Sequence, residues 1–223
     1  MKPKFWIASI CFVSLALAGC SSKLVQPDEY SGFLENYSDL TETKSPSGAP
    51  VMRWIEPGIN AGRYTRVFIQ PSQLFPPPQA SEKIPQSTLD GITQYYDQAL
   101  KTQFSKALPL ATGPGPGTLV VQPAITAVSA KTEGLHAYEV IPIALVAAGV
   151  SAATGIRDQD TTLATEAAFI DADTGRIVAK VVRKGAGNTL ENSSQVMVAK
   201  DARAVLDGWA KDMFTSFQQL KSQ

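Results

Sequence analysis

The sequence predicts an α+β fold, a two-layer sandwich in which a small, mostly antiparallel sheet carries two amphipathic helices on one face. Two stripes of apolar residues at helical spacing, within residues 89–108 and 199–220, predict the helices. Apolar and β-branched runs bounded by proline and glycine predict the strands. Two helices bury both stripes when they lie together on one face of a sheet, which gives the two layers.

The elements before the first helix are short. Residues 51–56 and 64–70 predict strands, because each is a β-prone run that stops at a proline. Residues 41–50 are rich in turn formers and predict a loop. Residues 72–85 contain three consecutive prolines, which are extended, and predict a loop that crosses the surface.

The first helix is predicted over residues 89–108, with Ser87 or Thr88 as its N-cap. Residues 119–129 predict a strand, and Pro123 places that strand at an edge or at a bulge.

A hairpin and a long helix complete the domain. Residues 162–171 and 176–183 predict the hairpin, with Gly175 in its turn. The residues expected to share a face are Leu163, Thr165, Ala167 and Phe169 in the first strand, and Ile177, Ala179 and Val181 in the second. The closing helix is expected to start near Ser193 or Ser194 and to carry the stripe that ends at Leu220.

The composition excludes several classes of function. Twenty Lys and Arg residues balance 20 Asp and Glu residues, whereas a dedicated nucleic-acid binder would show a basic excess. One histidine and two cysteines are too few for a zinc site. We therefore expect no nucleic-acid partner, no metal and no cofactor other than a covalent lipid.

The N-terminus predicts that lipid. Lys2 and Lys4 precede an uncharged apolar run, residues 5–17, which is too short to span a bilayer as a helix. The run ends in Leu17-Ala18-Gly19-Cys20, which resembles the lipobox of bacterial lipoproteins. That resemblance implies cleavage before Cys20 and acylation of its thiol by chains such as palmitate; an ordinary secretory signal followed by a free thiol is the alternative.

The domain boundaries follow from this cleavage. We expect a signal peptide over 1–19, a lipidated tether over 20–30, and a single periplasmic domain over 31–223, with 31–60 as an extension packing on it. Two or more acyl chains give stable anchoring. Ser21 follows the cysteine where aspartate would favour the inner membrane, so we expect an outer-membrane location with the domain facing the periplasm. The extension carries Phe33, Tyr37 and Leu40 at helical spacing.

Two motifs suggest chemistry only weakly. His136 lies between Glu133 and Glu139 and could serve as a general base, but no nucleophile accompanies it and a loop or core histidine explains it as well. The run from Asp171 to Gly175 begins like a calcium loop, but its glycine comes fifth rather than sixth and a hairpin turn explains it. We therefore expect no catalytic residues.

The run 140–156 is the least ordinary segment, since its 17 residues contain no charge. It could be part of the core, a surface that packs on another copy or another envelope protein, or a segment that inserts into the membrane. The residues of the expected interaction surface are Val140, Ile143, Leu145, Ala147, Ala148, Val150 and Ala152.

Several blocks resemble a proteobacterial lipoprotein family of unknown function, of the domain of unknown function 3313 type. They are the lipobox, Ser31-Gly32-Phe33-Leu34 with Tyr37 and Leu40, residues 54–58 and 64–71, Thr154-Gly155-Ile156-Arg157-Asp158, and Val181-Val182-Arg183-Lys184-Gly185. The resemblance covers nearly all of the mature chain and implies no activity or site. The element order is also similar to lipoprotein domains that build rings or activate envelope machines, which is an analogy of topology.

Three functions remain open from the sequence. The first is a non-enzymatic outer-membrane lipoprotein that is a structural or assembly component of an envelope complex, either as a homo-oligomer or with another envelope protein. The second is a periplasmic binding module for a hydrophobic or cell-wall ligand, which would need a closed pocket lined by the strands and both helices. The third, an envelope hydrolase that uses His136, is the least supported.

Overall fold

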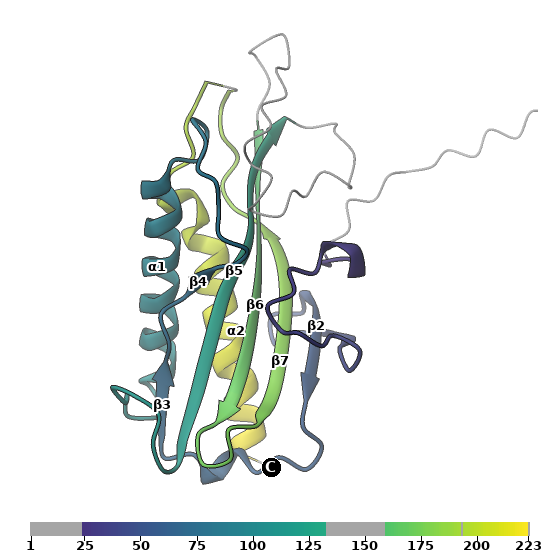
Figure 1. The fold of residues 1–223 in the computed structure, drawn as a ribbon, viewed down its shortest axis with the longest axis vertical. Helices are drawn as coiled ribbons and strands as arrows, with labels where there is room; N and C mark the ends of the chain where they lie inside the picture. Colours follow the sequence, from purple (N-terminus) through teal and green to yellow (C-terminus); the bar gives the residue numbers. More distant parts are fainter. Residues whose placement is uncertain (1–23, 133–158, 193, 223) are drawn as a thin grey trace, which may run out of the picture.

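A seven-stranded mixed sheet forms the centre of the molecule, described here by a computed structural model over residues 24–132, 159–192 and 194–222 (Figure 1). Its strands are β1 (Thr41–Lys44), β2 (Pro50–Ile55), β3 (Arg66–Ile69), β4 (Gln73–Leu74), β5 (Thr118–Thr132), β6 (Gln159–Asp171) and β7 (Ile177–Ala186). The strand order is β1-β2-β7-β6-β5-β3, and β4 also pairs with β5. β3 and β4 run parallel to β5 and all other pairs are antiparallel, so the predicted α+β class with a mostly antiparallel sheet is confirmed.

Two short strands lie where the sequence predicted loops. β1 consists of the polar residues Thr-Glu-Thr-Lys at the edge of the sheet, so it shows no alternation of apolar and polar residues. β4 has only two residues, within the predicted surface loop 72–85. Both loop predictions were therefore wrong in part, because edge strands this short leave no periodic signal.

Pro123 lies inside β5 rather than in an edge strand. β3 pairs with β5 up to Val121 and β4 pairs with it from Ala124, so Pro123 falls in the gap between these two partners. A register shift between Ile125 and Ala127 follows two residues later. The gap accommodates a residue that has no N–H to donate, and the nearby irregularity agrees with the predicted bulge.

The helices α1 (Gln86–Phe104) and α2 (Arg203–Lys221) lie together on one face of the sheet, as predicted (Figure 1). Tyr96 of α1 meets Trp209 of α2 edge to face, with ring centroids 6.4 Å apart. Phe104 packs edge to face on Phe214, at 5.9 Å. These rings form the centre of the larger apolar core, which lies between the helices and the inner face of the sheet.

Both helix starts differ from the prediction. α1 begins at Gln86 after Pro85, and the Thr88 hydroxyl donates to the Met197 carbonyl at 2.7 Å instead of capping the helix. α2 begins at Arg203, after a 3₁₀ turn, η5 (Ala199–Ala202), so the predicted start near Ser194 was too early. In both cases a tertiary contact or a tight turn precedes the helix, and the apolar periodicity alone does not show it.

A bulge near the start of β7 changes which side chains of this strand point to each face of the sheet. The pairing of β6 with β7 shifts so that Phe169 faces Ala179 while Ile170 faces Ile177. Val181 then points into the inner core, whereas Ile177 packs on the outer face. The prediction that Ile177 shares a face with Val181 was wrong, because one inserted residue reverses the alternation.

The outer face of the sheet is also covered. Residues 24–40, which we call the strap, cross it in a series of turns that includes a short 3₁₀ turn, η1 (Pro27–Glu29). Phe33 lies in a turn, and Tyr37 and Leu40 flank the next turn, so none of the three lies in a helical turn although their spacing is helical. A sandwich of two layers with one bare face is therefore not confirmed, since the strap adds a thin third layer.

Candidate functional site

The predicted site residues lie outside the described residues. Cys20 is four positions before the first described residue, Leu24, and the expected interaction surface within 140–152 falls in the gap between Thr132 and Gln159. His136, Glu133 and Glu139 fall in the same gap. The described segment that follows Cys20 in the chain is the strap, and the strap with its partners on the sheet is the candidate functional site.

Apolar contacts fix the strap to small residues of the sheet. Val25, Leu34 and Leu40 are buried in a second core that lies on the outer face. The sheet residues of this core are Ala127, Ala164, Ala168 and Val182. Three of these four are alanines, whose short side chains let a chain without regular structure approach the strands closely.

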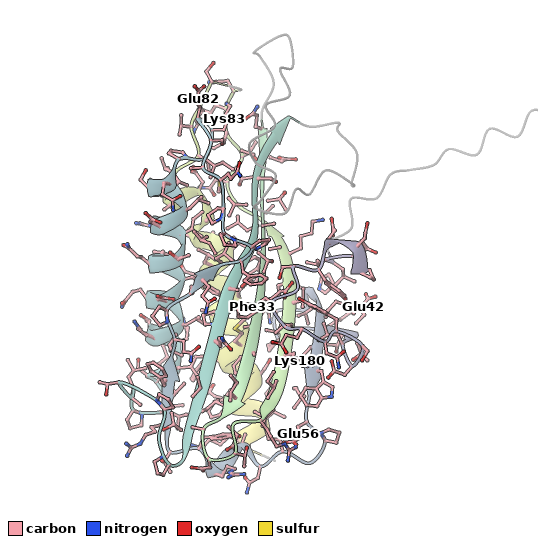
Figure 2. The ribbon with its side chains drawn as sticks, viewed as in Figure 1. Phe33, Glu42, Glu56, Glu82, Lys83 and Lys180 are labelled. Atoms are coloured by element: carbon pink, nitrogen blue, oxygen red, sulfur yellow. The ribbon has the colours of Figure 1, made fainter. Side chains whose placement is uncertain are left out.

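Aromatic rings add further contacts. Tyr30 and Tyr37 stack within the strap, with ring centroids 4.3 Å apart and planes 8° from parallel. Phe33 meets Phe75 edge to face at 5.6 Å. Figure 2 shows Phe33 and Lys180 where the strap crosses the sheet. The strap is therefore fixed to the sheet by buried apolar side chains and aromatic contacts near both of its ends and in its middle, while several residues between them are exposed.

Glu166 of β6 is the centre of the polar contacts. Its side chain is 0% exposed. Its Oε1 accepts a hydrogen bond from the Ser31 N–H at 3.0 Å, and its Oε2 accepts one from the Tyr37 hydroxyl at 2.6 Å. Burial, followed by the hydrogen bond to Glu166, raises the pKa of Tyr37 to about 12, so its hydroxyl remains a donor at neutral pH.

Two lysines of β7 pair with acidic residues of the strap. Lys180 Nζ lies 2.9 Å from an Asp39 carboxylate oxygen and donates to the Asn36 carbonyl at 2.9 Å. Its ammonium also lies 5.5 Å from the centre of the Trp54 ring. Further along the strand, Lys184 Nζ lies 2.9 Å from Glu29 Oε1, and both side chains are no more than 10% exposed. Together with Glu166 these pairs hold the strap at three separate points.

The strap shortens the chain that is free to act as a tether. The sequence predicted a polar tether through Tyr30, but Val25 is 4% exposed and Glu29 is paired with Lys184. Only the five chain steps from Cys20 to Val25 precede the packed segment, and they span at most about 17 Å. A lipid on Cys20 would therefore hold the domain next to the membrane surface.

The sequence contains one signal for this site. Glu166 interrupts the apolar run Leu-Ala-Thr-Glu-Ala-Ala-Phe, and a charge in the middle of a strand buried on both faces needs a partner. The sequence could not show that the partners are Ser31 and Tyr37, since 129 or more positions separate them from Glu166.

The run from Asp171 to Gly175 forms the hairpin turn. Asp171 Oδ1 accepts from the N–H groups of Asp173 and Thr174, and Gly175 has a φ of +69°. Arg63 Nη1 lies 3.2 Å from Asp171 Oδ2. Burial opposes ionisation of Asp171, but its hydrogen bonds and Arg63 outweigh burial and lower its pKa. The carboxylate is thus already occupied by donors of the protein.

The described residues hold neither a cluster of metal ligands nor a membrane-spanning helix. No group of three or more His, Cys, Asp or Glu side chains in this part of the chain could hold a metal ion. Among the helices that the structure describes, none is long and apolar enough to cross a membrane.

Comparisons with known proteins agree with the sequence resemblance. A family model for a protein of unknown function (DUF3313) matches residues 29–213. The chain is 44% identical over 206 residues to YdcL, an uncharacterised lipoprotein from Escherichia coli strain K12, and the match covers 92% of each chain.

Similarity to solved structures is weak. A PelC dodecamer from Paraburkholderia phytofirmans matches at 11% identity and a TM-score of 0.38, covering 73% of this chain and 96% of that one. A minor lipoprotein from Acinetobacter baumannii matches at 10% identity and a TM-score of 0.38, covering 70% and 92%. Because both scores lie below 0.5, neither match carries an inference about assembly or function.

Proposed function

Since this chain belongs to the DUF3313 family, a lipoprotein family of unknown function, we propose that it is a non-enzymatic structural or assembly component of an envelope complex. In this proposal acylated Cys20 anchors it in the outer membrane, with the domain in the periplasm. The observation that carries the proposal is the packing of the strap, the segment directly after Cys20, onto the sheet through Glu166, Lys180 and Lys184.

A strap that is packed on the sheet favours assembly because it lowers the entropic cost of joining a complex. A domain on a long flexible tether samples many orientations and loses that freedom when it joins a complex. Here at most about 17 Å of chain lies between the packed strap and the lipid. The height and the tilt of the domain above the membrane are therefore restricted before it joins a complex. Such restriction lowers the entropic cost of association, whereas a protein that carries a ligand away from the membrane would gain from a longer tether.

The proposed contact surface is the uncharged run that contains Val140, Ile143, Leu145, Ala147, Ala148, Val150 and Ala152. The strands that lead to it are well paired. β5 and β6 continue in register to Thr132 and Gln159, beyond the last β7 pair, which joins Thr162 to Ala186. The segment that contains the run therefore leaves the described sheet after Thr132 and re-enters it at Gln159, at the same end of the sheet.

The experiment that tests this proposal is the native mass of the lipoprotein extracted from the membrane in mild detergent, before and after Ala147→Phe. We expect a discrete species heavier than one chain, and we expect Ala147→Phe to reduce it to a single chain with an unchanged melting temperature. Gln94→Phe, at an exposed position of α1, is the matched control and should leave the mass unchanged.

Two outcomes would count against the proposed surface or the proposed function. If Ala147→Phe unfolds the chain, the run belongs to the core. If the extracted wild-type protein is a single chain, and cross-linking in intact membranes also gives no discrete larger species, the assembly role is wrong. Separation of inner and outer membranes on a density gradient tests the location independently.

A further inference from the structure

A small apolar cavity lies on the helix-bearing side of the sheet, between the last turns of α2 and the strands β2, β6 and β7. Its volume is about 50 Å³ and it is partly open to solvent. Its apolar walls include Ile55, Phe169, Val181, Phe217 and Leu220, and Ala61 of the 3₁₀ turn η2 (Ala61–Arg63) lines it as well. Because α1 contributes no residue to it, this is not the large pocket between both helices that a carrier of bulky hydrophobic ligands would need.

Two arginines, Arg53 and Arg183, also line the cavity, and of these Arg183 pairs with a carboxylate. Arg183 is 4% exposed, and its Nη1 lies 2.8 Å from Asp212 Oδ2. Asp212 already accepts hydrogen bonds from the N–H and the hydroxyl of Ser47. In the described part of the chain, Arg183 Nε has no hydrogen-bond partner although it is buried.

Arg53, the second arginine, is half-buried beside Arg183. Its Nη1 makes a long contact of 3.4 Å with the Ser216 hydroxyl, and none of the described carboxylates pairs with it. Burial and the positive charge of Arg183 both lower the pKa of Arg53. The site therefore holds two guanidinium groups against one carboxylate, next to apolar walls.

We propose that this cavity binds a small aliphatic monocarboxylate, with its carboxylate on Arg53 and its hydrocarbon tail against Phe217 and Val181. A buried or half-buried guanidinium is normally paired, and a carboxylate matches its planar set of donors. The bound anion would bring the local charge to balance. This site is independent of the assembly role proposed above.

The volume sets the length of the tail. A buried water needs about 10–15 Å³ of such space, so 50 Å³ holds roughly four non-hydrogen atoms. Each methylene that enters should tighten binding about fourfold, which is the fold-change for burying one CH₂ group. Affinity should thus rise from acetate to butanoate and pentanoate, and then level off for longer chains that project into solvent.

The test is a titration of the full mature chain, carrying Cys20→Ser so that no acyl chain or detergent competes, with sodium acetate, butanoate, pentanoate and octanoate. Nuclear magnetic resonance shifts or calorimetry would give the dissociation constants. We expect saturable binding that follows this length series and that weakens at least tenfold in Arg53→Gln, the loss typical of one charge-assisted hydrogen-bonded contact. Arg66→Gln, at an exposed position of β3, should bind as the wild type does.

A second variant tests the effect of cavity volume on binding separately from the effect of the Arg53 charge. Ala179→Val adds volume to the wall of the cavity and should weaken pentanoate more than acetate, while the fold is checked by its melting temperature. The inference is overturned if the wild-type chain shows no saturable binding of any of the four acids. It is equally overturned if Arg53→Gln binds them unchanged, since Arg53 would then serve only to cover apolar surface. Neither result would change the native mass, so the assembly proposal is tested separately.

Discussion

Glu166 lies in the middle of β6, with its side chain fully buried and both carboxylate oxygens accepting hydrogen bonds from the strap. A buried carboxylate is tolerated only when hydrogen bonds replace its hydration. The Ser31 N–H and the Tyr37 hydroxyl provide two of these bonds, and both are brought there by the strap. Glu166 thereby makes the stability of the domain depend on a segment outside the sheet-and-helix core.

Replacing Glu166 tests this dependence. Glu166→Ala leaves two part-buried donors, the Ser31 N–H and the Tyr37 hydroxyl, without this partner, and we expect it to lower the free energy of unfolding by about 2–4 kcal/mol. The measurement is urea denaturation of the mature chain carrying Cys20→Ser. Glu42→Ala, at an exposed carboxylate of β1, is the control and should change stability by less than about 0.5 kcal/mol. Equal effects of the two substitutions would show that the strap contacts add nothing.

A single residue, Asp212, is expected to make the stability of the fold depend on pH. Burial opposes its ionisation, but the hydrogen bonds from Arg183 and from the serines of the β1–β2 turn outweigh burial and lower its pKa in the folded state. A lowered pKa means that the unfolded chain binds the proton first, so this contribution to stability is present above about pH 4 and is lost as the pH falls through the folded-state value.

Asp212→Asn should therefore act in two ways. At pH 7 it breaks a buried ion pair, and we expect a loss of about 3 kcal/mol in the free energy of unfolding. Below about pH 4 the difference between variant and wild type should shrink, because the unfolded wild-type chain then binds a proton that the folded chain does not, which lowers the stability of the wild type. Denaturation at pH 7, 5, 4 and 3 measures both effects, with the exposed Asp90→Asn as the control. A difference that is constant with pH would assign the loss to packing and not to charge.

At the scale of elements, two glycines within helices provide a matched pair. Gly91 lies in α1 and Gly208 in α2, and alanine favours a helix over glycine by about 1 kcal/mol in each. A Cβ at Gly91 would lie 2.8 Å from the Cβ of Ala199 in η5, whereas a Cβ at Gly208 meets nothing within 4 Å. The first glycine thus permits the contact of η5 with α1, and the second has no such role.

We expect Gly208→Ala to raise the free energy of unfolding by about 0.5–1 kcal/mol. Gly91→Ala should lower it by about 1–3 kcal/mol, because α1 and η5 must move apart. Thermal or urea denaturation of the two variants side by side gives the comparison. If Gly91→Ala stabilises the chain as much as Gly208→Ala does, η5 does not pack on α1 as described.

The sequence predicted long periodic elements well and short or irregular ones poorly. Both helices and the paired strands β5 to β7 carry enough apolar residues at a fixed spacing to be recognised. β1 and β4 are too short or too polar for that, and the bulge in β7 reverses the face of Ile177 without any local mark. The extension 31–60 was predicted to pack on the domain, but the course of the strap across the outer face and the packing of residues 24–30 were not predicted, because the partners of the strap lie more than 100 residues away in the sequence.

For the whole molecule, the third layer changes how the domain relates to its predicted anchor. Cys20 and the interaction surface were predicted from sequence patterns alone, and both stay predictions, since they lie outside the described residues. What the structure adds is the connection: the strap extends the folded unit to within five chain steps of Cys20. The proposed assembly role depends on this connection, because a short free tether restricts how the domain is presented at the membrane.

The measurement that tests this claim most directly is hydrogen exchange at the strap amides of the mature chain carrying Cys20→Ser. The Ser31 N–H donates to buried Glu166, and those of Gly32 and Leu34 donate to the Tyr37 hydroxyl. We predict that these amides exchange orders of magnitude more slowly than in an unfolded peptide, and that Glu166→Ala abolishes their protection. Exchange at unfolded-peptide rates in the wild-type chain would show that residues 24–40 are a free tether, and the account of a fixed anchor segment would be wrong.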